Sequence, residues 1–461
     1  MFRNVSSRRI IILFLNIIGL LLGTGVYAFF WMREFYPTVS RFTRTIKYTM
    51  NGHILTILLY FVLLYFFTST YGGFRVGYLK AVDVMISQFL SVLFVNLLTY
   101  VQHSLIYSWL MQSGPYWIML AIQTVIIILW TLLSDAVYHK IYPPRELLLV
   151  HGERPFDEIA EKFESRRDKF IIRDRIGMEG GPEAVCEKIR KGNFRNVILW
   201  DIPTADRNRI FKYCYGESIR VYLMPKIPDV LIKGSETLHL FDTPLLLTRE
   251  HALTIEQRLA KRLLDIALSS LLIVITSPLM LLTALAVKLT SRGPVLYKQV
   301  RCTAGGKEFR ILKFRSMRID AEKDGVARLA SKHDDRITAV GKVIRPVRID
   351  ELPQLFNIFI GDMSFIGPRP ERPEIIREYL KDMPEFAFRM KMKAGLAGYA
   401  QIYGKYNTSP YDKLKLDLTY IENYSIWLDI KLVLLTLKIL LKPESTEGVD
   451  KDQTTAARKR T

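Results

Sequence analysis

Four long apolar stretches dominate the first 140 residues. They run from about residue 10 to 32, 53 to 69, 81 to 102 and 115 to 138. A helix needs roughly 20 apolar residues to cross a bilayer, so each stretch is predicted to be a transmembrane helix. The first is long and lacks a small-residue cleavage site before the next charges, so we expect a retained helix rather than a cleaved signal peptide.

The basic residues of the short connections predict the orientation of these helices. Arg75 and Lys80 lie between the second and third stretches, and basic residues also precede the first, whereas residues 103–116 contain neither Lys nor Arg. The positive-inside rule therefore places both ends of the region in the cytoplasm. The segment 33–52 does not fit, because its four basic residues would lie outside; an amphipathic surface segment is one interpretation.

Short apolar runs alternate with polar helical stretches between residues 146 and 224. The runs are Leu147–Val150, Phe170–Ile172, Val197–Trp200 and Val221–Met224. This alternation predicts a small parallel, Rossmann-like α/β module. The first run is followed by His151–Pro155 and not by Gly-x-Gly-x-x-Gly, so the backbone cradle for a pyrophosphate is missing. A structural or docking role is therefore favoured over cofactor binding.

A fifth apolar stretch, Leu263–Val287, differs from the first four, because Ser277 and Pro278 lie near its middle and basic residues lie on both sides. Proline breaks the helical hydrogen-bond ladder, and Ser277 could bind a freed carbonyl. A helix-break-helix that enters and leaves the membrane by the same face satisfies both the backbone and the charge rule. We favour this re-entrant hairpin over a fifth span, which would export everything after it.

Composition fits a membrane protein that handles anions. The chain has 461 residues, 49% of them hydrophobic, and a net charge of +20 that is distributed over many segments. Such charge suits anionic lipids, phosphorylated substrates or nucleic acid. No zinc-finger spacing, RNA-binding signature or helix-turn-helix pattern is present, so nucleic acid is not an expected partner. The three cysteines and seven histidines show no disulfide-framework or metal-site spacing.

Charged residues stand beside turn-forming residues in several short motifs after residue 292. These motifs are Gly293-Pro294, Lys313–Met317, Arg345-Pro346, Asp350–Gln354 and Gly361–Pro370. Together and in this order they resemble the bacterial sugar transferase family, the monotopic phosphoglycosyl transferases. The similarity runs from about Lys261 to Leu441, and several motifs in one order are far more specific than one short pattern.

The resemblance implies an architecture, because the chain is similar to the large form of that family. It implies a four-helix transmembrane bundle, a Rossmann-like α/β module, and a mainly α monotopic catalytic domain with a re-entrant membrane helix. We assign the bundle to residues 1–140, the module with its linker to 141–250, the catalytic domain to 251–441 and a disordered tail to 442–461. The linker itself covers residues 225–250.

The resemblance also implies site residues. The catalytic dyad of the family would be Asp350–Glu351, the membrane hairpin would be residues 263–287 with its break at Ser277–Pro278, and Mg²⁺ would be required. One departure is the pair before the dyad, where relatives commonly carry a small hydroxyl residue and Leu. This chain has Arg348 and Ile349 there, which changes the local charge but leaves both carboxylates in place.

The residues around the dyad allow an independent interpretation. The apolar residues of 352–359 recur at helical spacing, which predicts an amphipathic helix that starts near the dyad, with Pro353 in its first turn, and stops by Gly361. Asp350 at its N-terminus would stay ionised and could act as a nucleophile, while Glu351 would be free to hold Mg²⁺. The alternative is that Asp350 is only an N-cap and Glu351 a first-turn charge.

Further charged residues are candidates for binding phosphate, metal or sugar. The basic candidates are Arg301, Lys313, Arg315, Arg345 and Arg369. Phosphoryl transfer depends on positioning and charge neutralisation, although each of these residues alone could be a solvated surface charge. Asp417 and Asp429 resemble acidic positions of the family, and they would either assist metal or sugar binding or pair with basic residues. Residues 426–441 form either an interfacial amphipathic helix or a buried one.

These features predict a multi-pass protein of the bacterial inner membrane with a cytoplasmic catalytic domain. Asp350 would attack a UDP-sugar, release UMP and form a phosphosugar-aspartate, which undecaprenyl phosphate, the acceptor implied by the family, would then attack. This reaction would initiate synthesis of a cell-surface polysaccharide. The alternative is a non-catalytic membrane scaffold; a phospholipid-head-group enzyme has no Asp-Gly-x-x-Ala-Arg pattern to support it. The sugar and the oligomeric state stay open, a homo-oligomer included.

Overall fold

The computed structural model describes residues 5–42, 49–107, 109–240, 242–248, 252–318, 334, 336–404 and 408–440. The predicted tail at 442–461 and residues 43–48 of the segment 33–52 lie outside the described residues. The chain divides into two compact units, Met1–Pro225 and Lys226–Thr461. The transmembrane and α/β predictions concern the first unit, and the catalytic prediction concerns the second.

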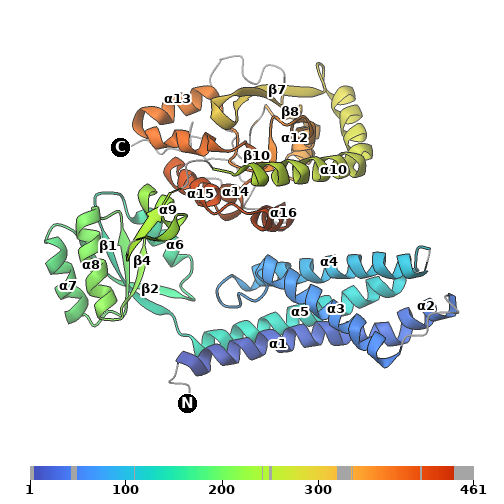
Figure 1. Cartoon of the computed structure of the whole chain (residues 1–461), viewed down its shortest axis with the longest axis horizontal. Helices are drawn as coiled ribbons and strands as arrows, with labels where there is room; N and C mark the ends of the chain where they lie inside the picture. Colours follow the sequence, from blue (N-terminus) through green and yellow to red (C-terminus); the bar gives the residue numbers. More distant parts are fainter. Residues whose placement is uncertain are drawn as a thin grey trace. The chain divides into compact units, whose positions relative to one another are not determined.

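Long helices make up most of the described residues up to 141. They are α1 (Val5–Phe30), a π-helical turn (Trp31–Phe35), α2 (Tyr36–Phe42), α3 (Met50–Tyr71), α4 (Ala81–Tyr107) and α5 (Gly114–Ile141). Four helical segments here, beginning at Arg8, Met50, Ala81 and Gly114, are long and apolar enough to cross a membrane, which confirms the four predicted stretches as helices. In Figure 1 the helices α1, α3, α4 and α5 run alongside one another. Extensive contacts join α1 to α3 and α5, and likewise join α4 to α3 and α5.

A buried polar network joins these four helices. The hydroxyl of Tyr60 on α3 donates to Asn96 Oδ1 on α4 at 2.8 Å, and Asn96 Nδ2 donates to Gln123 Oε1 on α5 at 2.9 Å. Gln123 Nε2 in turn donates to the carbonyl of Gly23 on α1 at 3.1 Å. Hydrogen bonds of this kind hold apolar helices in register where burial of apolar surface alone does not choose between partners.

A parallel sheet follows the helices. Its elements are β1 (Arg145–His151), α6 (Asp157–Glu164), β2 (Phe170–Gly177), α7 (Gly181–Lys191), β3 (Asn196–Trp200), α8 (Thr204–Gly216) and β4 (Arg220–Leu223). The strand order is β2-β1-β3-β4 with every pair parallel, which confirms the predicted alternation of strands and helices. Leu147–Val150 in β1 are completely buried, as expected for a central strand covered by helices on both faces.

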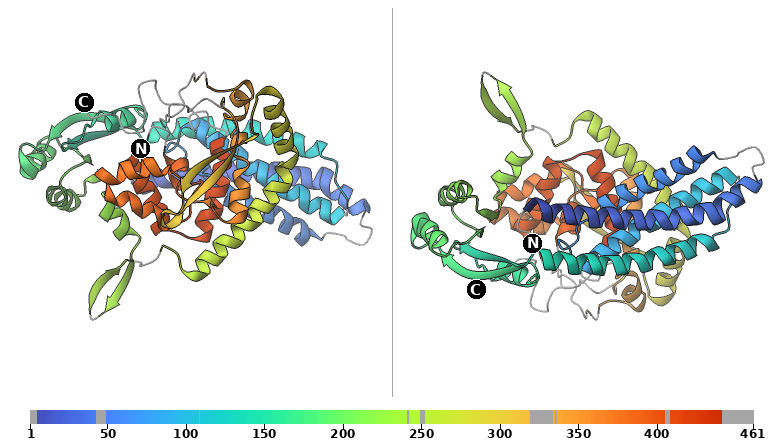
Figure 2. Two further views of the ribbon diagram at one scale, coloured as in Figure 1. Left: turned by 90° about the horizontal axis from the view of Figure 1, so that it is seen from above. Right: turned by 90° about the horizontal axis from the view of Figure 1, so that it is seen from below.

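The second unit is mainly helical. Its elements are α9 (Ile227–Lys233), β5 (Glu236–Leu240), β6 (Thr243–Leu247), α10 (Ile255–Thr290), β7 (Leu296–Cys302), β8 (Glu308–Phe314), α11 (Ala339–Ile344), α12 (Gln354–Ile360), β9 (Ser364–Ile366), α13 (Pro373–Asp382), β10 (Gly395–Ala397), α14 (Tyr399–Tyr403), α15 (Pro410–Glu422) and α16 (Ile426–Leu440). The predicted linker therefore contains a helix and a hairpin. Figure 2 shows the β5–β6 hairpin, in yellow-green, apart from the helices of its own unit.

The helix α10 is continuous where the sequence predicts a break. Its 36 residues include Pro278, and Figure 1 shows that the helix bends, so that its first and last parts run in different directions. Pro278 cannot donate to the carbonyl of Val274, and Ser277 Oγ donates to that carbonyl instead at 2.8 Å. The predicted recapture by Ser277 is thus confirmed, and because it satisfies the freed carbonyl, the proline bends the helix without interrupting it.

Both arms of α10 are anchored to the same domain. In the first arm, Lys261 Nζ lies 2.6 Å from Asp429 Oδ2, and Asp265 Oδ1 accepts from the backbone N–H of Phe365 at 2.8 Å. In the second arm, Met280 packs into a cluster with Phe314 on β8. The chain on both sides of Pro278 thus returns to one domain, whereas a straight helix of this length would extend about 54 Å.

We predict that Lys261→Met destabilises the protein by about 3–5 kcal/mol, because Lys261 and Asp429 are only 5% and 1% exposed and the substitution leaves a buried carboxylate unpaired. Thermal unfolding in detergent measures this loss. The double variant Lys261→Met with Asp429→Leu removes both charges and should recover most of it. Equal stability of the single variant and the unmodified protein would contradict the anchoring role of the pair.

Candidate functional site

The dyad lies in a tight connection between α11 and α12. Ile349–Glu351 form one turn of 3-10 helix, and α12 begins only at Gln354, with Pro353 as its N-cap residue. The predicted helix thus begins one turn later than the sequence indicates, and Pro353 precedes its first turn instead of occupying it. The predicted end is confirmed, since Gly361 stops the helix with a φ of 106°.

Arg348 makes the turn that brings the chain into the dyad. Its backbone is left-handed, with φ 55° and ψ 22°, a conformation that a bulky residue rarely adopts. Its guanidinium Nη1 lies 3.5 Å from Glu351 Oε2. The sequence marks Arg348 as a departure from the family, but neither its turn nor its ion pair with the dyad was predicted, because arginine carries no sequence signal for a positive φ.

Three cations surround the buried carboxylate of Glu351. Lys313 Nζ donates to its Oε1 at 2.8 Å, and Arg369 Nη2 donates to the same oxygen at 3.1 Å. Burial of Glu351 opposes ionisation, but the charges of Lys313, Arg369 and Arg348 outweigh it and hold the pKa of Glu351 well below its usual value. Glu351 is therefore an anion at any physiological pH, with one oxygen fully engaged.

Asp350 has the opposite tendency. Burial, and next the negative charge of Glu351, raise its pKa from 3.8 to about 6, while Lys313, Arg345 and Arg348 act against the rise. Asp350 is thus ionised at neutral pH but poorly stabilised as an anion. Adjacent carboxyl groups with pKa values moved in opposite directions are typical of sites that divide two chemical roles between two acids.

The structure brings some of the predicted basic residues to the dyad and places others elsewhere. Lys313 and Arg369 bind Glu351 directly, and Arg345, at the C-terminal end of α11, lowers the pKa of Asp350 through its charge. Arg301 instead donates through Nη1 to the carbonyl of Pro370 at 3.1 Å. The buried Arg315 donates to the carbonyl and hydroxyl oxygens of Ser291 at 2.8 and 2.7 Å, and so ties β8 to the end of α10.

Asp417 and Asp429 are buried in internal ion pairs. Asp417 Oδ2 lies 2.8 Å from Arg389 Nη2, and Asp429 binds Lys261 and accepts from the hydroxyl of Tyr420 at 2.7 Å. Both are 1% exposed. Of the two interpretations that the sequence allows, these contacts favour pairing with basic residues over binding of metal or sugar. The helix that carries Asp429, α16, buries one face and exposes Trp427.

A magnesium ion fits this site only if it takes most of its ligands from substrate and water. Among the described residues, no group of three or more His, Cys, Asp or Glu side chains is placed to hold a metal. Glu351 Oε2 lies 3.5 Å from Arg348 Nη1, whereas Oε1 accepts from both Lys313 and Arg369 at shorter distances. Mg²⁺ bound through one or two carboxylates plus phosphate oxygens matches this donor set.

Exposed apolar side chains precede and follow the dyad in the sequence. Val343 and Val347 precede it, at α11 and just beyond, and Phe356, Phe359 and Ile360 lie on the outer face of α12. Large exposed apolar groups of this kind mark contact with lipid or with another protein. The dyad therefore lies between two segments that each present an apolar surface.

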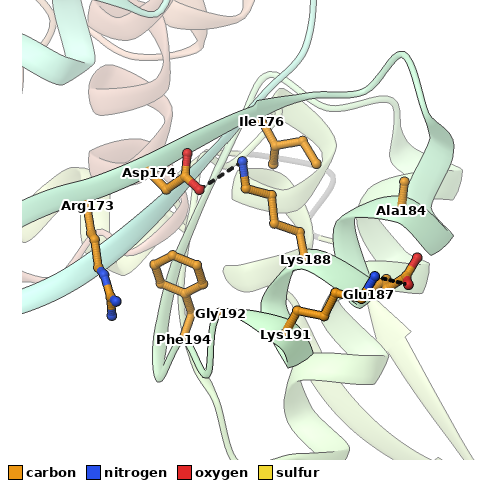
Figure 3. A pocket seen from close by; sticks show the side chains of 9 residues that line it. All are labelled: Arg173, Asp174, Ile176, Ala184, Glu187, Lys188, Lys191, Gly192 and Phe194. Carbon is orange, nitrogen blue, oxygen red and sulfur yellow. Dashed lines mark ion pairs between the residues drawn. The ribbon is translucent and has the colours of Figure 1, made fainter.

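The α/β module carries a pocket whose lysines are each paired with an acid. A pocket of about 590 Å³ lies between β2 and α7 (Figure 3), where Lys188 pairs with Asp174 at 2.9 Å and Lys191 with Glu187 at 2.7 Å. At the carboxyl end of the sheet, a Cβ on Gly152 would overlap the carbonyl of Asp201, so the loops after β1 and β3 touch where a dinucleotide would bind.

Comparison with known proteins identifies the second unit. A model of the family described as bacterial sugar transferase matches residues 256–443. A UDP-glucose:undecaprenyl-phosphate glucose-1-phosphate transferase of Caulobacter vibrioides is 42% identical over 192 residues, which cover 41% of this chain and 72% of that protein. The chain belongs to the bacterial sugar transferase family. The resemblance seen in the motifs is thereby confirmed.

Other bacterial sugar transferases are similar over comparable lengths. A UDP-N-acetylgalactosamine-undecaprenyl-phosphate N-acetylgalactosaminephosphotransferase of Aeromonas hydrophila is 44% identical, covering 39% of this chain and 43% of that protein. A UDP-glucose:undecaprenyl-phosphate glucose-1-phosphate transferase of Escherichia coli K12 is 34% identical, covering 56% of this chain and 57% of that protein. This chain therefore spans about half the length of these two relatives. Their names state different sugars, so similarity to them does not identify a donor for this chain.

We predict that Asp350→Asn stabilises this bacterial sugar transferase at neutral pH. The raised pKa of Asp350 means that the folded state pays a penalty for its charge, fully present above about pH 6 and absent below the unfolded value of 3.8. The variant should therefore unfold roughly 2–5 °C higher at pH 7.5, and the difference should vanish toward pH 4. A variant that is less stable at pH 7.5 would contradict the penalty.

Proposed function

We propose that this bacterial sugar transferase moves a sugar-1-phosphate from a UDP-sugar to undecaprenyl phosphate. The observation that carries the proposal is the dyad itself: a poorly stabilised Asp350 next to a Glu351 held anionic by three cations. The matched domain is shared with relatives whose names state this reaction with glucose or N-acetylgalactosamine. The product, a lipid-linked sugar, would begin synthesis of a cell-surface polysaccharide.

In the first step, an Asp350 carboxylate oxygen attacks the phosphorus that bears the sugar. A new bond forms between that oxygen and the phosphorus, the bridge to the second phosphate breaks, and UMP leaves with the bonding electrons. The product is an acyl phosphate, in which the phosphosugar is bound to the carboxylate oxygen of Asp350. Burial of the Asp350 carboxylate supports its role as the nucleophile, because an anion with little solvation is a better nucleophile than one that is fully hydrated.

In the second step, a phosphate oxygen of undecaprenyl phosphate attacks the same phosphorus. The bond to Asp350 breaks, the carboxylate is restored, and undecaprenyl-diphosphate-sugar is released. Because the donor and the acceptor use the site in turn, one nucleophile serves a water-soluble substrate and a membrane-bound one. The exposed apolar residues before and after the dyad, among them Val343 and Phe356, support access from a lipid surface.

The cations of the site neutralise the transferring phosphate. Arg345 acts on Asp350 and Arg369 binds Glu351, so both lie within reach of charge that develops near the dyad. Lys313 is bound to Glu351 and would be released in part when a diphosphate enters. Mg²⁺ held through Glu351 would supply further neutralisation of the diphosphate when bound.

The bend in α10 supports a re-entrant path. Ion pairs and apolar contacts anchor the helix to one domain on both sides of Pro278, which fits a hairpin that enters and leaves the bilayer by one face. With such a path, and with both ends of the four-helix region in the cytoplasm as the charge rule predicts, the catalytic domain would lie on the cytoplasmic side of the inner membrane, with the dyad at the membrane surface.

Measurement of UMP release tests the proposal. The purified full chain, given undecaprenyl phosphate, Mg²⁺ and a panel of UDP-sugars, should release UMP from at least one donor. Asp350→Asn should lower the rate roughly 10³-fold or more, and Glu351→Gln about 10²-fold, because each removes a different role. Glu378→Gln, at an exposed acid of α13, is the matched control and should stay within about twofold.

No UMP release from any donor would refute the transfer reaction and favour a scaffold, whose polymer production would survive both dyad substitutions. Full activity of Asp350→Asn would instead refute Asp350 as the nucleophile.

The pKa of Asp350 predicts the pH dependence of the rate. Only the carboxylate attacks, so kcat/KM should fall tenfold per pH unit below about pH 6, the folded-state value. Lys313→Gln removes a cation that lowers this pKa and should move the acidic limb to higher pH. Glu351→Gln removes an anion that raises it and should move the residual activity to lower pH. Shifts in the same direction would contradict the assignment.

A further inference from the structure

The turn that carries Arg369 is held by donors from elsewhere in the domain. Its two prolines, Pro368 and Pro370, have no backbone N–H, so the turn has little capacity to hold itself through its own amides. Its three successive carbonyls accept instead from the backbone N–H of Gly395 at 2.9 Å, from Arg389 Nη2 at 3.0 Å and from Arg301 Nη1 at 3.1 Å.

Arg389 is the donor to the central carbonyl, that of Arg369 itself. It is 6% exposed, and the same Nη2 lies 2.8 Å from Oδ2 of the buried Asp417. Its Nη1 lies 3.9 Å from Glu371, and its guanidinium stands 4.8 Å from the ring centre of Phe386. Contacts on several sides fix the guanidinium, so the carbonyl of Arg369 is fixed as well.

The side chain of Arg369 extends from this fixed point to the dyad, where its Nη2 meets Glu351 Oε1 at 3.1 Å. Arg389 and Asp417 make no recorded contact with Asp350 or Glu351 in the described part of the chain. A buried ion pair is a weak source of stability compared with apolar residues of equal size. Because Arg389 also donates to the carbonyl of Arg369, the pair holds the backbone of this turn.

We infer that Arg389, held by Asp417, is a positioning residue for Arg369. It fixes the backbone of the turn so that the Arg369 guanidinium meets the diphosphate of a nucleotide donor, a ligand class that rests on the proposed function. Neither Arg389 nor its pairing with Asp417 follows from a motif, since Arg389 lies 20 residues beyond the turn in the sequence.

A double-mutant cycle on UDP binding tests this role. Equilibrium dialysis of radiolabelled UDP against the full chain measures Kd for four proteins: unmodified, Arg369→Ala, the pair Arg389→Met with Asp417→Leu, and all three substitutions together. The pair replacement leaves no buried charge of the ion pair unpaired. It should weaken binding about tenfold in the unmodified background and less than about twofold in Arg369→Ala, because Arg389 acts through Arg369.

The matched control is Lys415→Met. Lys415 is a buried lysine on the same helix as Asp417, and it pairs with Asp412 at 2.7 Å. Its substitution therefore tests the effect of disturbing this helix while the donors to the turn of Arg369 are kept. UDP binding should stay within about twofold. If the paired replacement does not fold, Arg389→Lys is used in both backgrounds in its place. This variant keeps the positive charge but changes the donor geometry, so it should weaken UDP binding about threefold only when Arg369 is present.

Equal weakening in both backgrounds, or no weakening in a folded Arg389 variant, would overturn the positioning role. Failure of the unmodified chain to bind UDP would overturn the positioning role, and UMP release from a UDP-sugar would then show separately whether the proposed function holds. A third result is that UDP binding shows the expected coupling between Arg389 and Arg369 but no UDP-sugar gives UMP release. This would leave Arg389 as a positioning residue and refute the transfer reaction alone, so the two failures are distinguishable.

Discussion

The ion pairing of Glu351 is the interaction on which the catalytic domain depends. A carboxylate with 9% exposure is stable as an anion only because Lys313 from β8, Arg348 from the turn and Arg369 from the Pro-Arg-Pro segment all face it. These three residues come from separate parts of the sequence, so one buried charge fixes how a strand, a turn and a proline-flanked loop meet. The position of Asp350 follows, since it is attached to the residue that the cations hold.

This arrangement has a chemical consequence. Lys313 and Arg348, two of the cations that keep Glu351 ionised, also limit how far burial raises the pKa of Asp350. Asp350 therefore stays anionic near neutral pH while it remains poorly solvated. The buried pair of Arg389 and Asp417 extends this organisation outward, because it fixes the turn from which Arg369 reaches the dyad.

Much of the fold could be predicted from local patterns, because length and periodicity report burial. The four apolar stretches, the four parallel strands and the stop at Gly361 are of this kind. The structure differs where one residue compensates for another: Ser277 satisfies the carbonyl that Pro278 frees, so α10 bends without breaking. The site is less predictable. The motifs mark Asp350 and Glu351, but the left-handed turn at Arg348 and the contact of Arg389 with Arg369 join residues by geometry that no short pattern records.

The acyl phosphate at Asp350 can be detected by mass spectrometry in the absence of the lipid acceptor. The full chain is mixed with a UDP-sugar that supports UMP release, quenched in acid and digested, and the mass of the peptide that contains Asp350 is measured. We expect an added mass of one phosphosugar on that peptide. This added mass should be absent in Asp350→Asn and should be lost when undecaprenyl phosphate is supplied before the quench. UMP release that occurs only with the lipid present, with no added mass at any time, would contradict it.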